Sequence, residues 1–325
     1  MKSFNTSPFN DALEDLRISG SVLLHETYTP PWRIDIPEEA ELQHLLGVSK
    51  DVRVLPFHLV RNGAFDLRYE GHKSMHIAKD ELVICPSGEA HRMSFGKAVQ
   101  PVSFAQILEE QSPLPLRPLK EMSGGTELVC GVFQLRSVPL NPLLAALPLV
   151  LKVKTVGGNA NPMLVHATQM LAMELSNDRR GSFTVSRLLE VFCAEAIRSY
   201  RQNSGAQDPG WFKALDDPKI AKALTHVHRH PGEAWTVASL AEKCAMSGSR
   251  FAARFRDTTG QSVMSYVARW RMSVACRLLR DTDNNLAAIA DEVGYQDLAA
   301  FSRAFKELVG ESPAKWRIRD QMQCA

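Results

Sequence analysis

The sequence predicts an α+β chain: a strand-rich N-terminal domain, a short helical region, and an all-α C-terminal domain. Short segments rich in Val, Leu, Ile and Phe, separated by turn residues, occupy roughly the first 155 residues. From Pro162 onward, apolar residues recur at helical spacing instead. Two segments within the last hundred or so residues resemble each other, which indicates an internal repeat.

Composition places few limits on function. The chain has 325 residues, which suits two domains, and its 45% hydrophobic content is ordinary for a globular protein. Its net charge of +2 favours no partner, although the small positive excess lies in the C-terminal part. Because the chain shows no long apolar run and no signal-peptide pattern at its start, we expect a cytoplasmic protein that does not span a membrane.

The cysteines predict neither a disulfide framework nor a structural zinc site. They are scattered and form no Cys-x-x-Cys pair. We therefore expect free thiols, several of them in the core. The six positions are Cys85, Cys130, Cys193, Cys244, Cys276 and Cys324.

The N-terminal segments are typical of a β-sandwich or a small barrel. The segments RVLPFHLV and ELVICP have strand composition, and turn signals follow them at residues 61–63 and 86–88. Closely spaced short strands of this kind usually form a sandwich or a barrel.

Two helices are predicted between Pro162 and Gln202. The first carries the apolar pair Leu164 and Leu171, and the second carries Leu188 and Phe192. These stripes predict a dimer contact. The alternative is that they cover the strand-rich domain of the same chain.

The repeat consists of residues 237–260 and 286–310, and each copy is predicted to form a helix-turn-helix unit. Phe251 and Phe255 stand 9 and 5 residues before Gly260, and Phe301 and Phe305 stand at the same distances before Gly310. In a helix, residues four apart lie on one face, so each pair of phenylalanines points inward. Ser247 and Asp297 are the expected N-caps of the two second helices.

The outer face of each second helix is small and basic, as insertion into the major groove of DNA requires. The alternative is a plain helical domain with solvated arginines, but two copies make DNA binding the stronger interpretation. The predicted DNA-binding residues are Ser247, Ser249, Arg250, Arg254 and Arg256 in the first copy, and Ala299, Ser302, Arg303 and Lys306 in the second.

The C-terminal region resembles the AraC/XylS family of bacterial transcription regulators. The matching motifs are WTVASLAEKCAMSGSRFAARF, YVARWRMSVACRLL and IADEVGYQDLAAFSRAFKELVGESPAKWR. The resemblance implies about seven helices over residues 218–317, with recognition helices at 247–256 and 298–306. Arg303 holds a place where many relatives have a DNA-contacting arginine. Ala253 holds the equivalent place in the first copy, and Arg254 follows it.

The N-terminal region resembles the cupin-type sensor domain of one subgroup of this family. The motifs include Pro31-Trp32, Phe57-His58-Leu59-Val60 and Pro86-x-Gly88-x-x-His91. The implied architecture is a cupin-like β-barrel over residues 1–155, a helical linker and dimerisation region over 156–204, and a DNA-binding domain with two helix-turn-helix units over 205–325.

The strand-rich domain offers candidates for effector binding. Trp32, His58 and His91 are the candidate contacts, with buried structural histidines as the alternative for the latter two. No metal is expected, because the segment RVLPFHLVRNG has one histidine, His58, and no His-x-His, and Pro56 stands where metal-binding cupins carry glutamate. Cys85 is a candidate redox sensor, or else a buried thiol.

These observations predict a sequence-specific transcription regulator, without cofactor or catalytic residues, controlled by a small molecule or a redox signal. The expected partners are double-stranded DNA, an effector, a second copy of the chain and RNA polymerase, with activation as the commoner outcome that the resemblance implies. Two alternatives stay open: a cupin-type metalloenzyme with a helical appendage, and an adaptor whose helix-turn-helix units no longer bind DNA.

Overall fold

A computed structural model describes residues 7–50, 52–97, 99–108, 116–117, 125–136, 140–158, 160–177, 179–204 and 210–322. These residues form two compact units, one rich in β-sheet and one helical. The predicted α+β class is confirmed. No helix in the described ranges combines the length and the apolar character that crossing a membrane would require.

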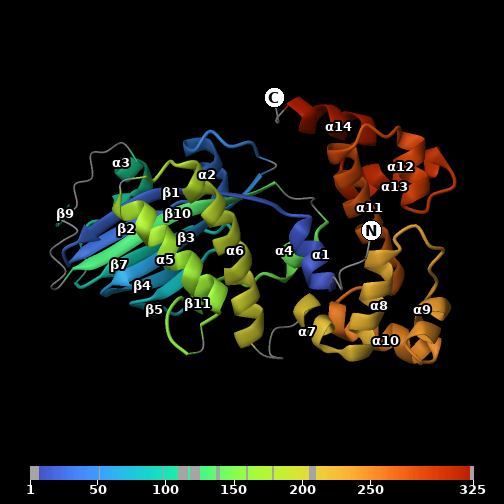
Figure 1. Ribbon diagram of the computed structural model, residues 1–325, viewed down its shortest axis with the longest axis horizontal. Coiled ribbons are helices and arrows are strands. Elements are labelled where there is room, and N and C mark those ends of the chain that lie inside the picture. The colour runs from blue at the N-terminus through green and yellow to red at the C-terminus, as the bar shows by residue number, and fades with distance from the viewer. Residues whose placement is uncertain are drawn as a thin grey trace. The chain divides into compact units, whose positions relative to one another are not determined.

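The β-rich unit contains two stacked sheets (Figure 1). The six-stranded sheet has the order β11-β6-β3-β10-β1-β9, and the five-stranded sheet has the order β5-β4-β7-β2-β8. The strands are β1 (Arg17–Tyr28), β2 (Trp32–Ile36), β3 (Val52–Asn62), β4 (Ala64–Tyr69), β5 (Met75–Ala78), β6 (Glu81–Ile84), β7 (His91–Phe95), β8 (Val102–Ser103), β9 (Leu116–Arg117), β10 (Thr126–Arg136) and β11 (Leu151–Lys154). The described strands thus form two separate sheets and no single closed barrel, so of the two forms that the strand pattern allowed, the sandwich is the one observed.

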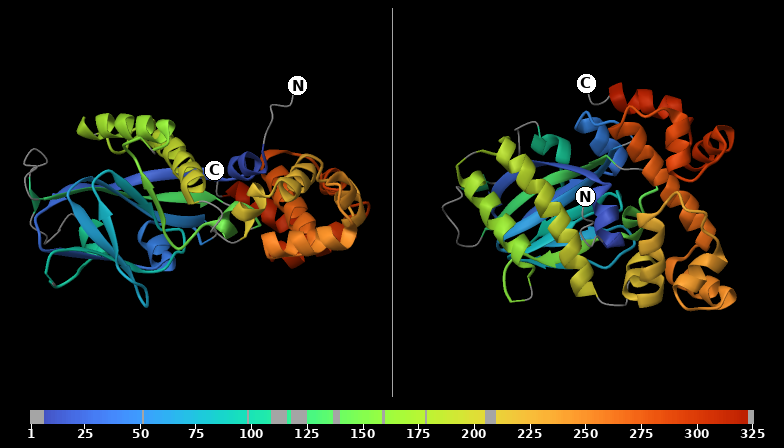
Figure 2. Two further views of the ribbon diagram at one scale, coloured as in Figure 1. Left: turned by 90° about the horizontal axis from the view of Figure 1, so that it is seen from below. Right: turned by 45° about the vertical axis from the view of Figure 1, so that its right-hand side comes forward.

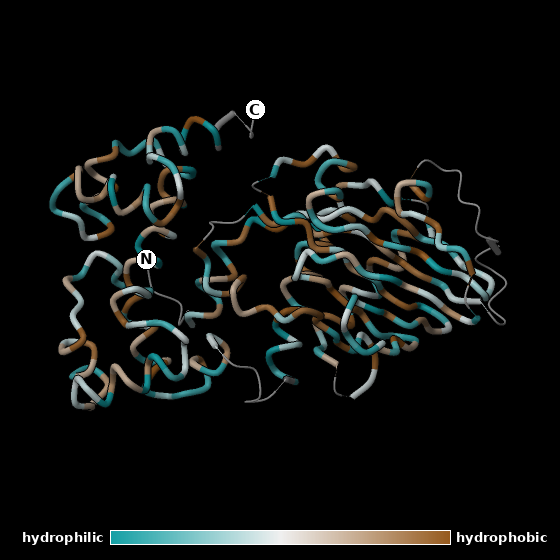
Figure 3. The backbone as a smooth tube through the Cα atoms, turned by 180° about the vertical axis from the view of Figure 1, so that it is seen from behind, coloured by the Kyte–Doolittle hydropathy of each residue, from teal (hydrophilic) through white to brown (hydrophobic). Residues whose placement is uncertain are grey.

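Strand β3 shows how the sequence divides its side chains between two cores. Because successive side chains point to opposite faces of a sheet, His58 and Val60 alternate with Phe57 along the strand. His58 is buried beside the apolar core between the sheets, where its ring lies 6.1 Å from that of Phe65. Phe57 faces the other way and stacks on Phe133 of β10 at 4.6 Å. Figure 3 accordingly shows hydrophobic residues interspersed with hydrophilic ones along the strands.

Two helices, α5 (Pro162–Ser176) and α6 (Phe183–Ser204), cover one side of the β-rich unit (Figure 2). Phe192 of α6 lies 6.2 Å from Phe57 and 6.4 Å from Phe133, so α6 packs on the six-stranded sheet. Leu164, Leu171 and Phe192 of the predicted dimer stripes are buried, and the fourth residue, Leu188, is half-buried. The stripes therefore cover the sheet of their own chain, and the prediction that they contact a second copy is corrected. Two short helices, α2 (Glu39–Leu45) and α3 (Phe104–Leu108), complete this unit.

The helical unit includes two segments from the range that the sequence assigned to the sensor domain. They are α1 (Pro8–Glu14) and α4 (Pro142–Ala146). The Asn141 side chain donates to the carbonyl oxygen of Ala12 at 2.6 Å, and Asp15 forms an ion pair with Arg277. Asp11 lies 3.6 Å from the buried imidazole of His228. These long-range polar contacts, which no local pattern reveals, join both segments to the helical unit.

Helices α9 (Val237–Lys243) and α10 (Gly248–Thr259) form the first helix-turn-helix copy, and helices α12 (Leu286–Glu292) and α13 (Leu298–Val309) form the second. One long helix, α11 (Val263–Asp281), joins the two copies, as Figure 1 shows. The two Phe pairs, one in each copy, are buried and have the same geometry, with 5.8 Å between ring centroids and 56° between ring planes. The predicted repeat is confirmed. The other helices are α7 (Trp211–Asp216), α8 (Pro218–Arg229) and α14 (Pro313–Met322).

The second helix of each copy, α10 in the first and α13 in the second, begins with a different kind of N-cap. Asp297 caps α13 as predicted, accepting hydrogen bonds from the amides of Ala299 and Ala300 at 3.1 and 3.0 Å. Ser247 stands at the N-cap of α10, but its side chain makes no capping hydrogen bond. The N-cap position was therefore correct in both copies, and the capping bond is present in the second.

The turn of the second copy requires glycine for two reasons. Gly294 has φ of 84°, and a Cβ there would lie 2.6 Å from the carbonyl oxygen of Gly232. Gly260 has φ of 75° with open space around it, so it shares the backbone conformation without the close contact. Comparing the two positions therefore separates backbone strain from steric overlap.

We expect Gly294→Ala to lower the free energy of unfolding of the helical unit by about 3 kcal/mol, because conformational strain and overlap add together. Gly260→Ala should cost about 1 kcal/mol, from the conformation alone. Urea denaturation of the full chain, followed by circular dichroism, measures both. Equal losses in the two variants would contradict the contact with Gly232.

Candidate DNA interface and sensor pocket

Helices α10 and α13 expose the residues that the sequence assigned to DNA binding. Arg250 and Arg256 of α10, and Arg303 and Lys306 of α13, are exposed. Within the described part of the chain, these four cations have no hydrogen-bond or ion-pair partner. Ser247, Ser249 and Ala299 are also exposed, and Ser302 is half-buried. Both helices thus present a slim face with positive side chains available for phosphates or base edges.

Arg254 differs from these four cations. Its guanidinium forms an ion pair with Asp217, the N-cap residue of α8. Burial raises the pKa of Asp217, but hydrogen bonds from Arg254 and from the amides of Ile220 and Lys219 outweigh it and lower that pKa overall. Arg254 therefore has a structural partner inside the domain, which leaves Arg250 and Arg256 as the free cations of α10.

Arg271 of α11 joins the loop that precedes the first helix-turn-helix copy to the turn of the second copy, a role that the sequence motifs did not indicate. It donates to the carbonyl oxygens of Pro231 and Glu233 at 2.8 and 2.7 Å, in the loop between α8 and α9. Its guanidinium also lies 5.8 Å from the centroid of the Tyr295 ring, in the turn of the second copy. Arg271 therefore fixes the turn of the second copy against the loop between α8 and α9. No motif predicts this, because its partners come from two separate segments of the chain.

The β-rich unit has a charged pocket of about 670 Å³ at β2, β4 and β7. In its wall, Arg92 of β7 forms an ion pair with Asp35 of β2 and donates a hydrogen bond to its carboxylate. This hydrogen bond is the main reason that the pKa of Asp35 lies below its usual value. His91 lines the pocket, whereas Trp32 and His58 lie in the core outside its lining. Other polar residues lining it are Glu41, Arg68, Tyr69, Glu70 and Ser103.

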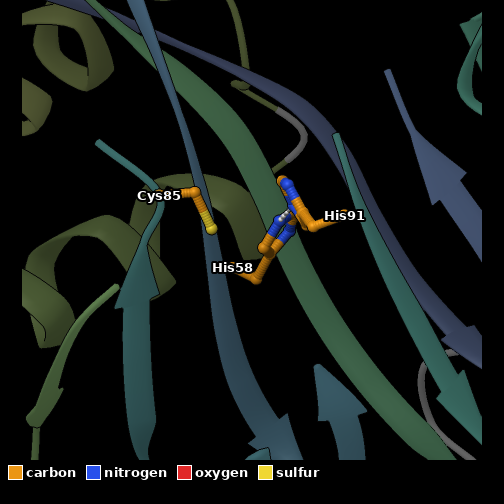
Figure 4. A group of neighbouring side chains, drawn as sticks. All are labelled: His58, Cys85 and His91. Carbon is orange, nitrogen blue, oxygen red and sulfur yellow. Dashed lines mark hydrogen bonds between the residues drawn. The ribbon is translucent and has the colours of Figure 1, made fainter. Parts of the chain in front are cut away.

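His91 also belongs to a buried cluster with His58 and Cys85 (Figure 4). The two imidazole Nε2 atoms are 3.0 Å apart. Burial lowers the pKa of His91 to about 4 and that of His58 well below its usual value, so both rings are neutral at physiological pH. Burial raises the pKa of Cys85 to about 12. A reactive thiolate needs a lowered pKa, so in this environment the Cys85 thiol stays protonated.

Two helix-turn-helix units with exposed, unpaired arginines define a DNA-binding protein, and comparisons with known proteins agree. A family model described as cupin matches residues 7–202, and a model described as a helix-turn-helix domain matches residues 240–319. An AraC-like transcription regulator of Streptomyces lividans is 30% identical over 83% of this chain and 88% of its own length. The chain belongs to this family of AraC-like transcription regulators.

Two further similarities cover, respectively, most of the chain and its C-terminal part. The transcriptional regulator AlkR of Acinetobacter baylyi is 27% identical over 80% of this chain and 86% of its own length. The DNA-binding domain of the transcriptional factor AdpA, solved with a target DNA, is 29% identical and covers 33% of this chain and 96% of its own, with a TM-score of 0.32. The matched family models and the Streptomyces relative show a DNA-binding transcription regulator with an N-terminal cupin-type domain.

Proposed function

We propose that the chain reads a specific DNA sequence with Arg250, Arg256, Arg303 and Lys306, while the pocket of the β-rich unit binds the controlling signal. One observation carries the DNA part: two copies with matched Phe pairs expose cations that have no partner in the described protein. Arginine reads guanine edges in the major groove, and lysine more often holds phosphates. Ser247, Ser249, Ala299 and Ser302 complete the proposed contact faces.

The test is selection of genomic DNA fragments by the purified full chain, followed by gel-shift titration on the fragments retained. If the proposal is correct, the retained fragments share a sequence element, and the chain binds this element at least about a thousandfold more tightly than unrelated DNA of equal length. Equal affinity for all fragments, or no binding at low salt, would overturn the proposal and would favour the adaptor alternative. The same fragments, used in transcription assays with RNA polymerase, test the predicted contact with the polymerase and the predicted activation.

The pocket suits a small polar molecule that carries charge, because cations and carboxylates share its wall. Of the three effector-binding candidates, His91 is the one that lines the pocket, and we propose that it forms part of the pocket wall. We propose Arg68 and Arg92, which also line the pocket, as effector contacts. Trp32 and His58 would support the pocket from the buried core without contacting the effector. Redox sensing at Cys85 would require something that stabilises its thiolate. We propose no catalytic role, since the family consists of regulators and no catalytic arrangement supports one.

We also propose that the chain forms a homodimer through the outer face of α5. Met163, Met170 and Met173 are exposed by 55%, 51% and 67%, and they follow one another at helical spacing. Contiguous exposed apolar side chains mark interaction surfaces, and flexible methionines adapt well to a partner. The partner we propose is a second copy of the chain.

Replacing Met170 and Met173 together with Glu should convert the dimer into monomers at micromolar concentration, because four carboxylates would face one another across the contact. Sedimentation equilibrium of the full chain measures this. Met264→Glu, at a methionine of α11 that is 42% exposed, is the matched control and should leave the dimer intact. A wild-type protein that sediments as a monomer would rule out this contact.

A further inference from the structure

The buried cluster of His58, Cys85 and His91 draws its members from both sheets of the β-rich unit. His58 lies on β3 and Cys85 directly follows β6, both in the six-stranded sheet, while His91 begins β7 of the five-stranded sheet. All three side chains converge in Figure 4, and each residue is at most 4% exposed. Three groups able to ligate a metal thus meet at one point inside an otherwise apolar sandwich.

Hydrogen bonding within the protein satisfies this cluster only in part. The Nδ1 atom of His91 lies 3.3 Å from the carbonyl oxygen of Glu89, so Nδ1 carries the proton and the lone pair of Nε2 accepts the hydrogen bond from Nε2 of His58, 3.0 Å away. The Nδ1 atom of His58 is buried without a hydrogen-bond partner. Unsatisfied buried polar atoms are rare in native proteins and require an explanation.

The donor set suits a transition metal of the zinc class. Imidazole nitrogen and cysteine sulfur are the ligands that Zn²⁺ prefers, whereas Mg²⁺ and Ca²⁺ require oxygen ligands. The three donor atoms lie within 4.8 Å of one another, and the two nitrogens are 3.0 Å apart. Two nitrogens on a tetrahedral zinc ion would be about 3.3 Å apart, and sulfur and nitrogen about 3.6 Å. Small side-chain movements would therefore bring the three atoms to bonding distance.

We propose that His58, Cys85 and His91 bind one ion of the Zn²⁺ class, which cross-links the two sheets of the sandwich. The imidazoles ligate as neutral Nε2 donors, and the contact of His91 with Glu89 orients the ring, as partners of metal-bound histidines commonly do. Cys85 releases its proton to solvent as the bond from sulfur to the metal forms. Burial of all three ligands identifies a structural site.

This donor set differs from that of the metal-binding cupins. The expectation of a metal-free domain rested on a missing second histidine and on Pro56 at the place of a glutamate. A cysteine one strand away supplies the third donor instead. The approach of Cys85 to the histidines depends on the pairing of β3 with β6. In this pairing His58 stands opposite Val83, and Val83 is two residues before Cys85 in the chain.

The test is titration of the full chain, freed of metal by chelator, with Co²⁺ as a spectroscopic substitute for Zn²⁺. We expect one equivalent to bind, with visible bands of tetrahedral cobalt and a near-ultraviolet band from charge transfer between sulfur and metal. Cys85→Ser should remove the sulfur band and weaken binding by more than about tenfold. His91→Gln should weaken binding similarly while a sulfur band persists at high cobalt concentration.

Cys193→Ser is the matched control, since Cys193 is equally buried in the same unit but lies on α6, outside the cluster. It should keep one equivalent of cobalt and the sulfur band. A wild-type chain that binds less than one equivalent at micromolar metal, or loss of the sulfur band in Cys193→Ser alone, would overturn the proposal. Metal content is measured without DNA or effector, so failure here is distinguishable from failure of the proposed DNA binding.

Discussion

The Arg303→Ala variant is expected to bind its specific DNA site about 10- to 100-fold more weakly, while its affinity for unrelated DNA falls by much less. Loss of a good bidentate contact to a base costs about 1–3 kcal/mol. Arg303 is exposed on α13 and has no partner among the described residues, so its guanidinium is free to make such a contact. Its loss also leaves the helix itself undisturbed.

Competition binding against specific and unrelated duplexes measures this difference, and two control variants sharpen it. Lys306→Ala should weaken both affinities by similar factors and lower the salt slope by about 1, as loss of a phosphate contact does. Arg254→Ala removes a cation already paired with Asp217, so its effect on the specific site should be smaller than that of Arg303→Ala. If Arg303→Ala weakens both duplexes equally, Arg303 contacts no base.

The behaviour of the two arginines shows what the sequence could and could not predict at the interface. Helical periodicity placed Phe301, Phe305 and Arg303 on the correct sides of α13, because those positions follow from the helical repeat alone. Arg254, which the same periodicity placed nearer the core, was also predicted to contact DNA, yet its partner Asp217 stands 37 residues earlier in the chain. Local periodicity contains no information about such a partner.

The same limit applies to the β-rich unit and to the segments around it. The stripes of α5 and α6 were predicted as apolar, but a stripe does not specify whether its own sheet or a second copy will cover it. Asp15 pairs with Arg277, which lies 262 residues away, so the packing of α1 with the helical unit was not predictable. Cys85 was singled out, but its meeting with the two histidines depends on strand register. What the sequence does determine well is local: caps, turns and the face of each helix.

The second large effect is expected from the phenylalanine anchors. Phe305→Ala should lower the free energy of unfolding of the helical unit by about 3–5 kcal/mol, the usual cost of removing a fully buried aromatic side chain. Phe305 is fully buried, and its ring lies 5.8 Å from Phe301 and 6.4 Å from Trp316. Since domains are stable by only about 5–15 kcal/mol, much of the second copy should unfold near physiological temperature.

Phe255→Ala is the matched variant in the first copy, where Phe255 contacts Phe251 and lies 5.7 Å from Tyr266. Equal Phe geometry in the two copies predicts losses of similar size. Leu298→Ala, on the exposed side of α13, should cost less than about 1 kcal/mol. DNA affinity at low temperature distinguishes a loss of folded protein from a loss of a DNA contact. Cooling should restore specific binding to Phe305→Ala, because more of that protein folds, but not to Arg303→Ala, because the contact with DNA is absent at any temperature. A Phe305→Ala protein as stable as Leu298→Ala would mean that the aromatic pair does not hold α13 in place.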